Sequence, residues 1–350
     1  MKKIQEGSAI IEIDENPKVS KKLEVFYNPI MKLNRDLTVL LLNSIPNKQM
    51  KIADIMAGTG VRSIRMIHEL NKGKIKEIYV NDISSINKIK KNIKLNKIKK
   101  VNLSSEDANL FLLKSEGFDY IDIDPFGNPN EFLDAAVKRI SRNGVLGVTA
   151  TDTSVLAGTY PKTAKRLYWA NTFRNGFMHE SALRILSRKV QLIGAQYDKA
   201  LIPIFSYAKE HYVRVFFRCI KGKKECDEVI KQHKYVIFNP KTLGYEITSL
   251  DYKRDCITIG PMFVGSLNDK ELVKKMIKSS KNKEEAKLLA MIYGELDIVG
   301  SYDIHMLSKK LNVSVPSFEP IIKKAKATRV HYNPTAIKTN INIKELSKLI

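Results

Sequence analysis

Cysteine is scarce in this sequence, which has three cysteines among 350 residues. Cys219, Cys226 and Cys256 are odd in number, and no two of them have the CxxC spacing typical of zinc and redox sites. The sequence therefore predicts no bound metal, and its cysteine usage is typical of a reducing compartment such as the cytoplasm.

Long hydrophobic runs are also missing. The longest, such as residues 37–42 (LTVLLL), fall far short of the roughly 18 to 20 apolar residues that span a bilayer. The N-terminal sequence MKKIQEGSAIIEI lacks the apolar core of a signal peptide. We therefore expect a cytoplasmic protein without a membrane partner.

Acidic residues are few relative to basic ones, since 37 Asp and Glu stand against 60 Lys and Arg and leave a net charge of +23. Such a surface attracts polyanions because each cation that neutralises a phosphate releases counterions. A compositional bias toward Lys, Ile and Asn, visible at residues 86–101, could supply much of this charge without any ligand. Nucleic acid is the favoured partner.

The length predicts two domains, and the first is an alternating α/β unit. A short strand or hairpin and a helix are expected in the first 50 residues. Apolar strands follow at residues 51–57, 77–83, 101–107, 118–125 and 143–151, with helical spacing between them. This order predicts a doubly wound, mostly parallel sheet of seven strands, which two antiparallel strands within 201–220 complete.

The pattern changes twice after the parallel strands. Residues 151–184 form an interrupting loop with Gly158, Pro161 and Gly176, and the composition turns polar near residue 222. We expect a first domain at 1–222, which includes an N-terminal extension and this loop as a substrate loop. A smaller, basic α+β domain is expected at 223–350, with a Lys-rich helical stretch at 269–296 and a helix, turn and helix at 302–327.

A glycine-rich turn follows the first parallel strand. Asp54 ends that strand, and Gly58, Thr59 and Gly60 lead into the next helix, where glycines let backbone N–H groups approach a ligand closely. Position 63 is serine, so the full GxGxxG motif is absent. A tight structural turn remains an equal alternative for this feature alone.

Two further acidic residues follow successive strands. Asp82 is placed to bind the hydroxyls of a ribose, and Asp107 with Ala108 to meet an adenine ring. Acidic strand ends disfavour a pyrophosphate and favour S-adenosylmethionine, which carries positive charge and no phosphate. The alternative is that these carboxylates are helix caps or solvated strand ends.

The fourth parallel strand ends in a candidate catalytic motif. Period-two alternation places Asp122 and Asp124 on one side, with Asp124 at the carboxyl edge of the sheet. The Asp124 carboxylate and the carbonyl of Pro125 could hold a purine amino group, and Phe126 could stack on a flipped base. The alternative is that DPFG is merely the start of a loop.

The motif DxDPFG resembles the D/N-P-P-Y/F motif of methyltransferases that modify exocyclic amino groups. This version is similar to that of the tRNA guanosine-26 N2-dimethyltransferase family. Further segments resemble the same family across nearly the whole chain: EGSAIIEI (6–13), VFYNPIMKLNRD (25–36), AGTGVRSIR (57–65), TDTSVLAGTYPKTAKR (151–166), MHESALRIL (178–186) and ATRVHYNPTAIKT (327–339).

The resemblance implies a class I S-adenosylmethionine-dependent fold and methylation of the guanosine N2 at tRNA position 26, through the monomethyl to the dimethyl product. It implies that Asp124 is the catalytic carboxylate and that Phe26 and Asn28 lie near the donor or target base. The residues that it implies as cofactor contacts are Arg35, Arg62, Arg65, Asp82, Asp107 and Ala108. Its position alone would make Arg35 a solvated helix residue.

One departure concerns the second domain. Many relatives carry paired CxxC elements there, which suggest a zinc site, whereas residues 238–246 (FNPKTLGYE) contain no cysteine pair. We predict no zinc and a different local fold in this stretch.

Basic and aromatic residues predict where tRNA is held. The 151–184 loop offers cations and rings suited to phosphates and a splayed base, although a solvated loop is the plainer interpretation. These are Lys162, Lys165, Arg166, Tyr168, Trp169, Arg174 and His179. A second basic cluster, which follows the helix, turn and helix, predicts a grip on the tRNA body: Lys323, Lys324, Lys326, Arg329 and His331.

Two other functions stay open from the residues alone. One is an amino-methyltransferase acting on another RNA or on DNA, and the other is a nonenzymatic RNA-binding protein, which would not bind the cofactor. Asp54 and Ser63 disfavour a dehydrogenase. Nothing in the sequence implies an obligate protein partner.

Overall fold

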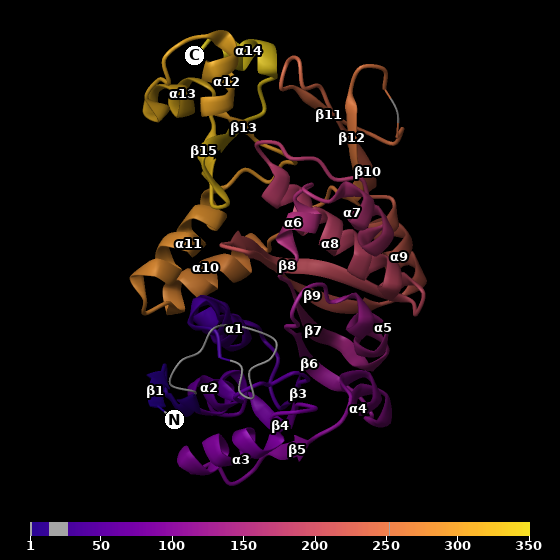
Figure 1. Ribbon diagram of the computed structural model, residues 1–350, viewed down its shortest axis with the longest axis vertical. Helices are drawn as coiled ribbons and strands as arrows, with labels where there is room; N and C mark the ends of the chain where they lie inside the picture. The colour runs from indigo at the N-terminus through magenta and orange to yellow at the C-terminus, as the bar shows by residue number, and fades with distance from the viewer. Residues whose placement is uncertain (1, 14–26, 252) are drawn as a thin grey trace.

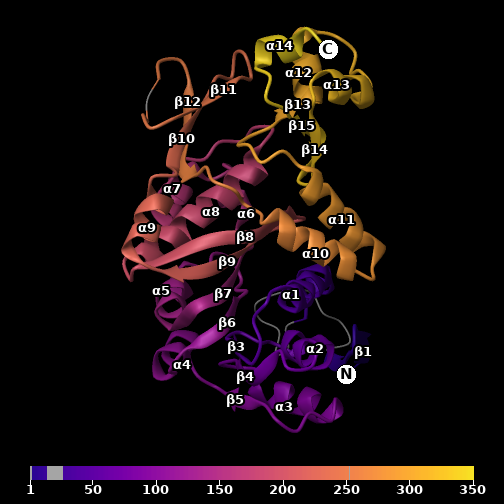
Figure 2. The ribbon, with the colours of Figure 1, turned by 180° about the vertical axis from the view of Figure 1, so that it is seen from behind.

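A mixed β-sheet forms the centre of the molecule (Figures 1 and 2). The computed structural model describes residues 2–13, 27–251 and 253–350, and within them this sheet has seven strands. In spatial order they are β5 (Asn102–Ser104), β4 (Ile75–Asn81), β3 (Met50–Asp54), β6 (Phe118–Ile123), β7 (Ile140–Ala150), β9 (Tyr212–Lys221) and β8 (Lys199–Lys209). The first five are parallel, and β9 pairs antiparallel with both β7 and β8, which confirms the predicted fold class.

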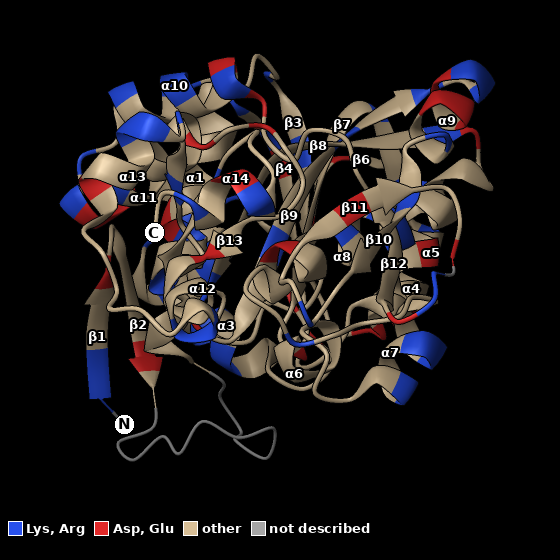
Figure 3. Cartoon of the chain, turned by 90° about the horizontal axis from the view of Figure 1, so that it is seen from above, with Lys and Arg blue, Asp and Glu red and all other residues tan. Residues whose placement is uncertain are grey.

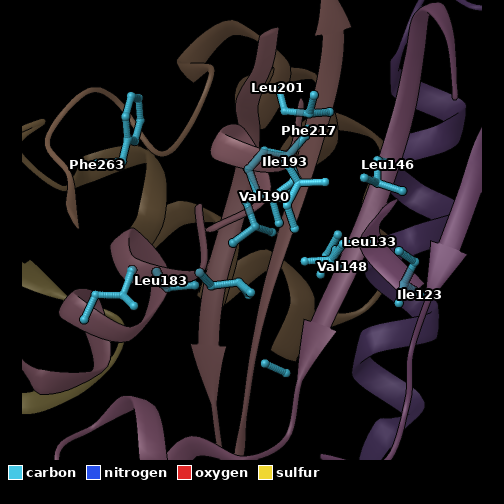
Figure 4. Packing of buried hydrophobic residues seen from close by; sticks show 14 of the residues in the cluster. Ile123, Leu133, Leu146, Val148, Leu183, Val190, Ile193, Leu201, Phe217 and Phe263 are labelled. Carbon is cyan, nitrogen blue, oxygen red and sulfur yellow. The ribbon is translucent and has the colours of Figure 1, made fainter. Parts of the chain in front are cut away.

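Helices connect the parallel strands and cover both faces of the sheet, as the alternating apolar pattern predicts. The connecting helices are α2 (Val61–Glu69), α3 (Ile86–Leu95), α4 (Ala108–Lys114) and α5 (Asn130–Arg139). The longest helix, α8 (Met178–Ala195), buries Leu183, Leu186, Val190 and Ile193 at helical spacing against the sheet (Figure 4). This packing joins α8 to β8 and β9, at the antiparallel side of the sheet.

The N-terminal extension folds over the helices of the first strands. The predicted hairpin consists of β1 (Lys2–Glu6) and β2 (Ala9–Ile13), joined at Gly7 with a φ of 54°. It packs on α2 and α3. The short helix η1 (Pro29–Met31) leads into α1 (Lys32–Ser44), whose apolar side chains belong to the same core as β1 and β2.

The segment 151–184 is more ordered than the predicted loop. It contains α6 (Thr153–Leu156) and α7 (Pro161–Tyr168). Pro161 does not interrupt structure here, because a proline at the first helical position lacks only an N–H that has no partner in the helix. The Asn130 side chain donates to the Leu167 carbonyl (2.9 Å), which ties α7 to the start of α5.

Three groups of elements follow residue 222. Strand β10 pairs with β11 and β12, and Val236, Ile259 and Phe263 share the core of α8. The predicted Lys-rich stretch is two helices packed near α1, and the predicted helix, turn and helix is α12 with α13. The elements are α9 (Lys223–Ile230), β10 (His233–Phe238), β11 (Tyr245–Thr248), β12 (Ile257–Phe263), α10 (Lys270–Ser279), α11 (Lys283–Gly294), β13 (Tyr302–Asp303), α12 (Ile304–Leu311), α13 (Phe318–Lys324), β14 (Thr328–Val330), β15 (Asn333–Lys338) and α14 (Ile343–Ser347). The domain boundary at 222 stays a prediction.

A buried carboxylate joins the C-terminal elements to the sheet domain. Glu180 on α8 pairs with Arg184 at 2.7 Å and with Lys338 of β15 at 3.1 Å, and it accepts a hydrogen bond from the Tyr332 hydroxyl. Burial opposes ionisation of Glu180, but Lys338 and Arg184 lower its pKa to about 2. Because Lys338 and Tyr332 both bind the Glu180 carboxylate, this residue connects the C-terminal elements to α8.

Candidate active site

The glycine-rich turn after β3 is fixed by the carboxylate of Asp82. Gly58 and Gly60 have φ values of 57° and 77°, which glycine adopts without steric cost. The Gly58 N–H donates to Asp82 Oδ2 at 2.8 Å, and a Cβ on Gly60 would lie 3.3 Å from the Ile89 side chain. The turn thus needs glycine at both positions, as a close approach of backbone to ligand requires.

Asp82 follows β4 and holds two loops at once. Its Oδ1 accepts from the backbone N–H groups of Ser84 (3.0 Å) and Ser85 (2.8 Å), while Oδ2 takes the Gly58 N–H. Each carboxylate oxygen has two lone pairs, so Oδ2 can accept one more donor, such as a ribose hydroxyl. The carboxylate is therefore oriented before any ligand arrives.

Asn81 joins three strand ends and was missed by the sequence interpretation. Its amide donates to the carbonyls of Ile55 (3.1 Å) and Glu106 (2.9 Å), and its Oδ1 accepts the Glu106 N–H (3.0 Å). The side chain is buried. The available signal was a polar residue directly before Asp82, at the end of an otherwise apolar strand.

Asp107 caps the N-terminus of α4, which is the alternative to ligand binding that its sequence position also predicts. Its Oδ1 accepts from the N–H groups of Asn109 (3.0 Å) and Leu110 (3.1 Å) and thereby begins α4. The side chain is exposed, and the neighbouring Ala108 is buried. A cap and a ligand contact are compatible, since a carboxylate has a second oxygen.

Asp124 lies one residue beyond the end of β6 and is bound by Arg62. The Arg62 guanidinium forms an ion pair with Asp124 and also lies 3.4 Å from Asp122. Its Nη1 donates to the side chains of Asn34 (2.9 Å) and Thr38 (3.1 Å). The structure therefore places Arg62 at the candidate catalytic carboxylate, and Asp124 keeps 18% of its side chain exposed.

A second buried arginine lies behind this pair. Arg214 of β9 is fully buried, and its Nη2 lies 2.6 Å from Asp122 Oδ2. Burial alone would favour the neutral acid, but Arg214 and Arg62 hold the pKa of Asp122 below its ordinary value. Two arginines and two aspartates thus alternate from the sheet core to the site.

Asp54 is buried beneath the same cluster. It accepts a hydrogen bond from the Ser63 hydroxyl at 2.7 Å. Burial raises the pKa of Asp54 to about 7, against the opposing charge of Arg62. At neutral pH this residue is therefore partly protonated. The serine at position 63, where the dinucleotide motif would have glycine, provides the hydroxyl that donates to this carboxyl group.

The residues after Asp124 form an open edge of the site. Pro125 is buried, and Phe126 has 42% of its surface exposed. Gly127 has a φ of 88°, and its N–H donates to the Thr151 hydroxyl at 2.7 Å.

The predicted Phe26 lies outside the described residues. Asn28 caps η1 by accepting the Ile30 N–H at 3.0 Å.

Comparison with known families identifies the chain. The model of the N2,N2-dimethylguanosine tRNA methyltransferases matches residues 7–350. The chain belongs to this family. Membership confirms the enzyme class predicted from the sequence.

Individual relatives are similar in sequence to this methyltransferase over nearly their whole length. The tRNA (guanine(26)-N(2)/guanine(27)-N(2))-dimethyltransferase of Aquifex aeolicus is 37% identical over 99% of this chain and 95% of its own. The tRNA (guanine(26)-N(2))-dimethyltransferase of Methanocaldococcus jannaschii is 37% identical over 99% and 98%. The structure of Trm1 from Pyrococcus horikoshii with S-adenosyl-L-methionine has a TM-score of 0.91 and 34% identity, and the match covers 100% of both chains.

Arg35 and Arg65 of the methyltransferase lie in a buried ion network. Both contact Glu6, with Arg35 Nε at 2.7 Å and Arg65 Nη1 at 3.1 Å, and Arg65 also pairs with Asp36 and Glu69. Burial opposes ionisation of Glu6, but the hydrogen bonds and charge of Arg35 lower its pKa to about 2. The position-based expectation that Arg35 is solvated is wrong, because Glu6 neutralises it inside the protein.

The predicted tRNA contacts of the methyltransferase lie on two separate surfaces. Arg166 and Arg174 are exposed in the 151–184 segment, and the lysines on and after α13 are exposed at the far end of the chain: Lys323, Lys324 and Lys326. Arg329 stacks over the Phe318 ring at 3.9 Å. His331 is not exposed with them, because it is bound to Glu295 and to the Ala208 N–H.

Metal and membrane features were searched over residues 2–13, 27–251 and 253–350. In this range no three His, Cys, Asp or Glu side chains gather as metal ligands would. No helix there has both the length and the apolar character that a bilayer crossing requires.

Proposed function

We propose that the carboxyl edge of the parallel strands holds S-adenosylmethionine beside guanine 26 of tRNA, with Asp124 as the catalytic carboxylate. The enzyme converts this guanosine through N2-methylguanosine to N2,N2-dimethylguanosine. The observation that carries the assignment is that Asp124, Pro125 and Phe126 end β6 on the same edge where the Gly58–Gly60 turn and Asp82 end β3 and β4. The relatives named for guanine 26 match 99% of this chain.

The residues at the turn fit the cofactor. Asp82 has a free acceptor position for a ribose hydroxyl, the glycine turn allows close approach, and the second oxygen of the exposed Asp107 carboxylate can accept from a ligand. When bound, S-adenosylmethionine supplies an electrophilic methyl group. The chain's own contribution is to orient the donor and acceptor, which can supply roughly 7 to 11 kcal/mol of the barrier reduction.

The catalytic motif acts on the guanine amino group. The lone pair of N2 is delocalised into the ring, so the nitrogen becomes nucleophilic only as it loses an N–H proton. The Asp124 carboxylate accepts one N–H, the Pro125 carbonyl accepts the other, and Phe126 stacks on the flipped base. As the N–C bond forms, the bond between the methyl carbon and the donor sulfur breaks and the N2 proton passes to Asp124, which the ion pair with Arg62 orients.

The function is tested with two tRNA transcripts that differ at one position. One carries guanosine at position 26 and the other adenosine, and nucleosides are identified by mass spectrometry after incubation with S-adenosylmethionine. We expect N2-methylated and N2,N2-dimethylated guanosine from the first transcript alone. Equal methylation of both transcripts would move the reaction to another site, and methylation of neither would point to another RNA.

The cofactor assignment predicts the effect of removing the Asp82 carboxylate. Asp82→Ala should raise the Kd of S-adenosylmethionine by about 10- to 100-fold, since a hydrogen bond to a charged group contributes about 1.5 to 3 kcal/mol. Calorimetric titration measures it. Asp134→Ala, which removes an exposed carboxylate of α5, is the matched control. A wild-type Kd in Asp82→Ala would contradict the ribose contact.

We also propose that residues 223–350 hold the body of the tRNA through the lysines near α13. Replacing Lys323, Lys324 and Lys326 with alanine should flatten the salt dependence of tRNA binding by about one unit of slope per lost phosphate contact. The control replaces three exposed lysines of α3 at the other end of the molecule (Figure 1): Lys90, Lys91 and Lys94. An unchanged slope in the α13 variant, or an equal change in both, would place the contact elsewhere.

The place of action follows from the substrate. We propose that the enzyme acts in the cytoplasm on tRNA without an obligate protein partner. Its three cysteines are free thiols, which a reducing compartment preserves.

A further inference from the structure

Helix α7 presents a face of cations that ends in an aromatic ring. The exposed residues have the spacing i, i+3, i+4 and i+7, which places them along one side: Lys162, Lys165, Arg166 and Trp169. The other side is fully buried at Ala164 and Tyr168. The sequence from 153 to 179 contains no Asp or Glu. Figure 3 shows the Lys and Arg colouring at both ends of α7.

Trp169 occupies a position that stability does not explain. It is the single tryptophan of the chain, and 47% of its surface is exposed. It caps α7 with a φ of 54°, in the left-handed region where glycine or asparagine usually ends a helix. A bulky side chain is disfavoured by this backbone conformation and about half of its surface stays exposed, so the exposed part of the ring points to an external contact.

Hydrogen bonds hold the backbone around Trp169, and a cation packs on its ring. Arg188 donates to the Trp169 carbonyl at 3.3 Å, and Asn171 and Gly260 exchange backbone hydrogen bonds of 2.7 and 2.8 Å. Lys189 Nζ lies 3.0 Å from the ring centroid, so a cation supports the ring from one side. A ring fixed in this way loses little conformational entropy when a planar group stacks on it.

The same helix is attached to the catalytic edge. Leu167 accepts a hydrogen bond from Asn130, the first residue of α5 and the fourth after Phe126, and the Tyr168 hydroxyl donates to Asp152 at 2.7 Å. Asp152 lies two residues beyond the end of β7, and α7 packs on α6 beside it (Figure 3). An RNA strand with its target base at Asp124 would therefore pass close to α7.

We propose that Trp169 is a second base-stacking site, which binds an unmethylated nucleotide of the same tRNA while the α7 cations hold its phosphates. Aromatic rings with flanking cations are the usual means of binding unpaired nucleotides, because every base has a stacking face and every linkage a negative charge. A protein partner fits less well, since lysine is depleted in protein interfaces. The inference rests on tRNA being the substrate.

Intrinsic fluorescence tests this directly because Trp169 is the sole tryptophan. Unmodified tRNA is titrated with excitation at about 295 nm, corrected for absorption with free N-acetyltryptophanamide, while binding is followed separately by gel mobility shift. We expect tRNA to lower the emission and to reduce quenching by acrylamide over the same concentration range as binding. Binding without either change would overturn the stacking site.

Variants separate this site from the catalytic function. Trp169→Ala should raise the Kd of tRNA by about 5- to 140-fold. This range is the stacking free energy of one base converted into a change in Kd, with a tenfold change for about every 1.4 kcal/mol. Trp169→Phe should keep most of the affinity. Tyr197→Ala, which removes another ring near a lysine outside both proposed tRNA surfaces, should leave Kd unchanged.

The outcomes are distinguishable from failure of the proposed function. At saturating tRNA, methylation of the position-26 guanosine by Trp169→Ala should persist, because the reacting groups are intact. A wild-type Kd in Trp169→Ala, with methylation intact, would refute the stacking site alone and leave the α7 face to a protein partner. Absence of methylation in the wild-type protein would refute the proposed function instead.

Discussion

Replacing Asp124 with asparagine should slow methyl transfer by about 10²- to 10⁴-fold while tRNA and cofactor still bind. Asparagine has the same size and can accept one N–H, but it cannot take the proton that N2 loses. It also removes one of the two carboxylates that pair with the Arg62 guanidinium, and Asp122 remains. The measurement is the single-turnover rate at saturating tRNA and S-adenosylmethionine, together with the two dissociation constants.

A control lies on the same strand. Asp119 is near the opposite end of β6, where its Oδ2 accepts the Lys51 N–H at 2.9 Å. Asp119→Asn keeps an acceptor there and should leave the single-turnover rate unchanged. An unchanged rate in Asp124→Asn would remove its catalytic role, and an equal loss in both variants would indicate damage to the strand rather than to the chemistry.

The site residues that sequence located well are those fixed by strand order. Asp82 and Asp124 each follow a parallel strand, and the carboxyl ends of parallel strands meet at one edge. Their positions therefore follow once the alternating pattern is recognised. The Asp82→Ala variant tests the cofactor-binding role of the first residue, and Asp124→Asn tests the catalytic role of the second.

Contacts between distant segments could not be predicted in the same way. Glu6 is 29 residues from Arg35 and 59 from Arg65, yet it binds both. The amphipathic pattern around Arg35 does not indicate which carboxylate pairs with it. A charged residue without a known ion-pair partner is expected in solvent. Only the folding of the hairpin over α2 brings the carboxylate there.

The 151–184 segment shows a different limit. Its Gly and Pro residues indicated a loop, and tertiary contacts nevertheless stabilise α7. The spacing of Lys162, Lys165 and Arg166 was visible in the sequence, but its meaning as one exposed face depended on knowing that these residues are helical. The left-handed backbone of Trp169 had no sequence signal.

Arg214 was also missed, and its removal should be strongly destabilising. Arg214→Met leaves the fully buried Asp122 short of its closest cation, and breaking a buried ion pair costs about 3 to 5 kcal/mol. We expect a fall of this size in the free energy of unfolding, measured by urea denaturation with an unchanged m-value. The charge of Arg62, at 3.4 Å, offsets part of the loss.

Two variants show whether the ion pair is responsible. Arg218 lies four residues further along β9 and donates to the neutral oxygens of Asn47 (3.2 Å) and Asn143 (3.1 Å). Arg218→Met should therefore cost less, about 0.5 to 1.5 kcal/mol. The double variant Arg214→Met/Asp122→Leu should recover much of the stability, because neither charge is left unpaired. Equal losses in the two arginine variants would contradict the assignment.

The pH dependence of the Arg214→Met defect gives an independent test. In the folded wild-type protein Arg214 and Arg62 keep the pKa of Asp122 below its ordinary value, so the pair's contribution is present above the unfolded-state pKa of about 4 and lost as the pH falls below it. Protonation also removes the unpaired charge of Asp122 in the variant. The difference in unfolding free energy between wild type and Arg214→Met should therefore narrow as the pH falls below about 4. A constant difference would mean that Arg214 stabilises the sheet by packing, as over the Phe216 ring at 4.5 Å, rather than by charge.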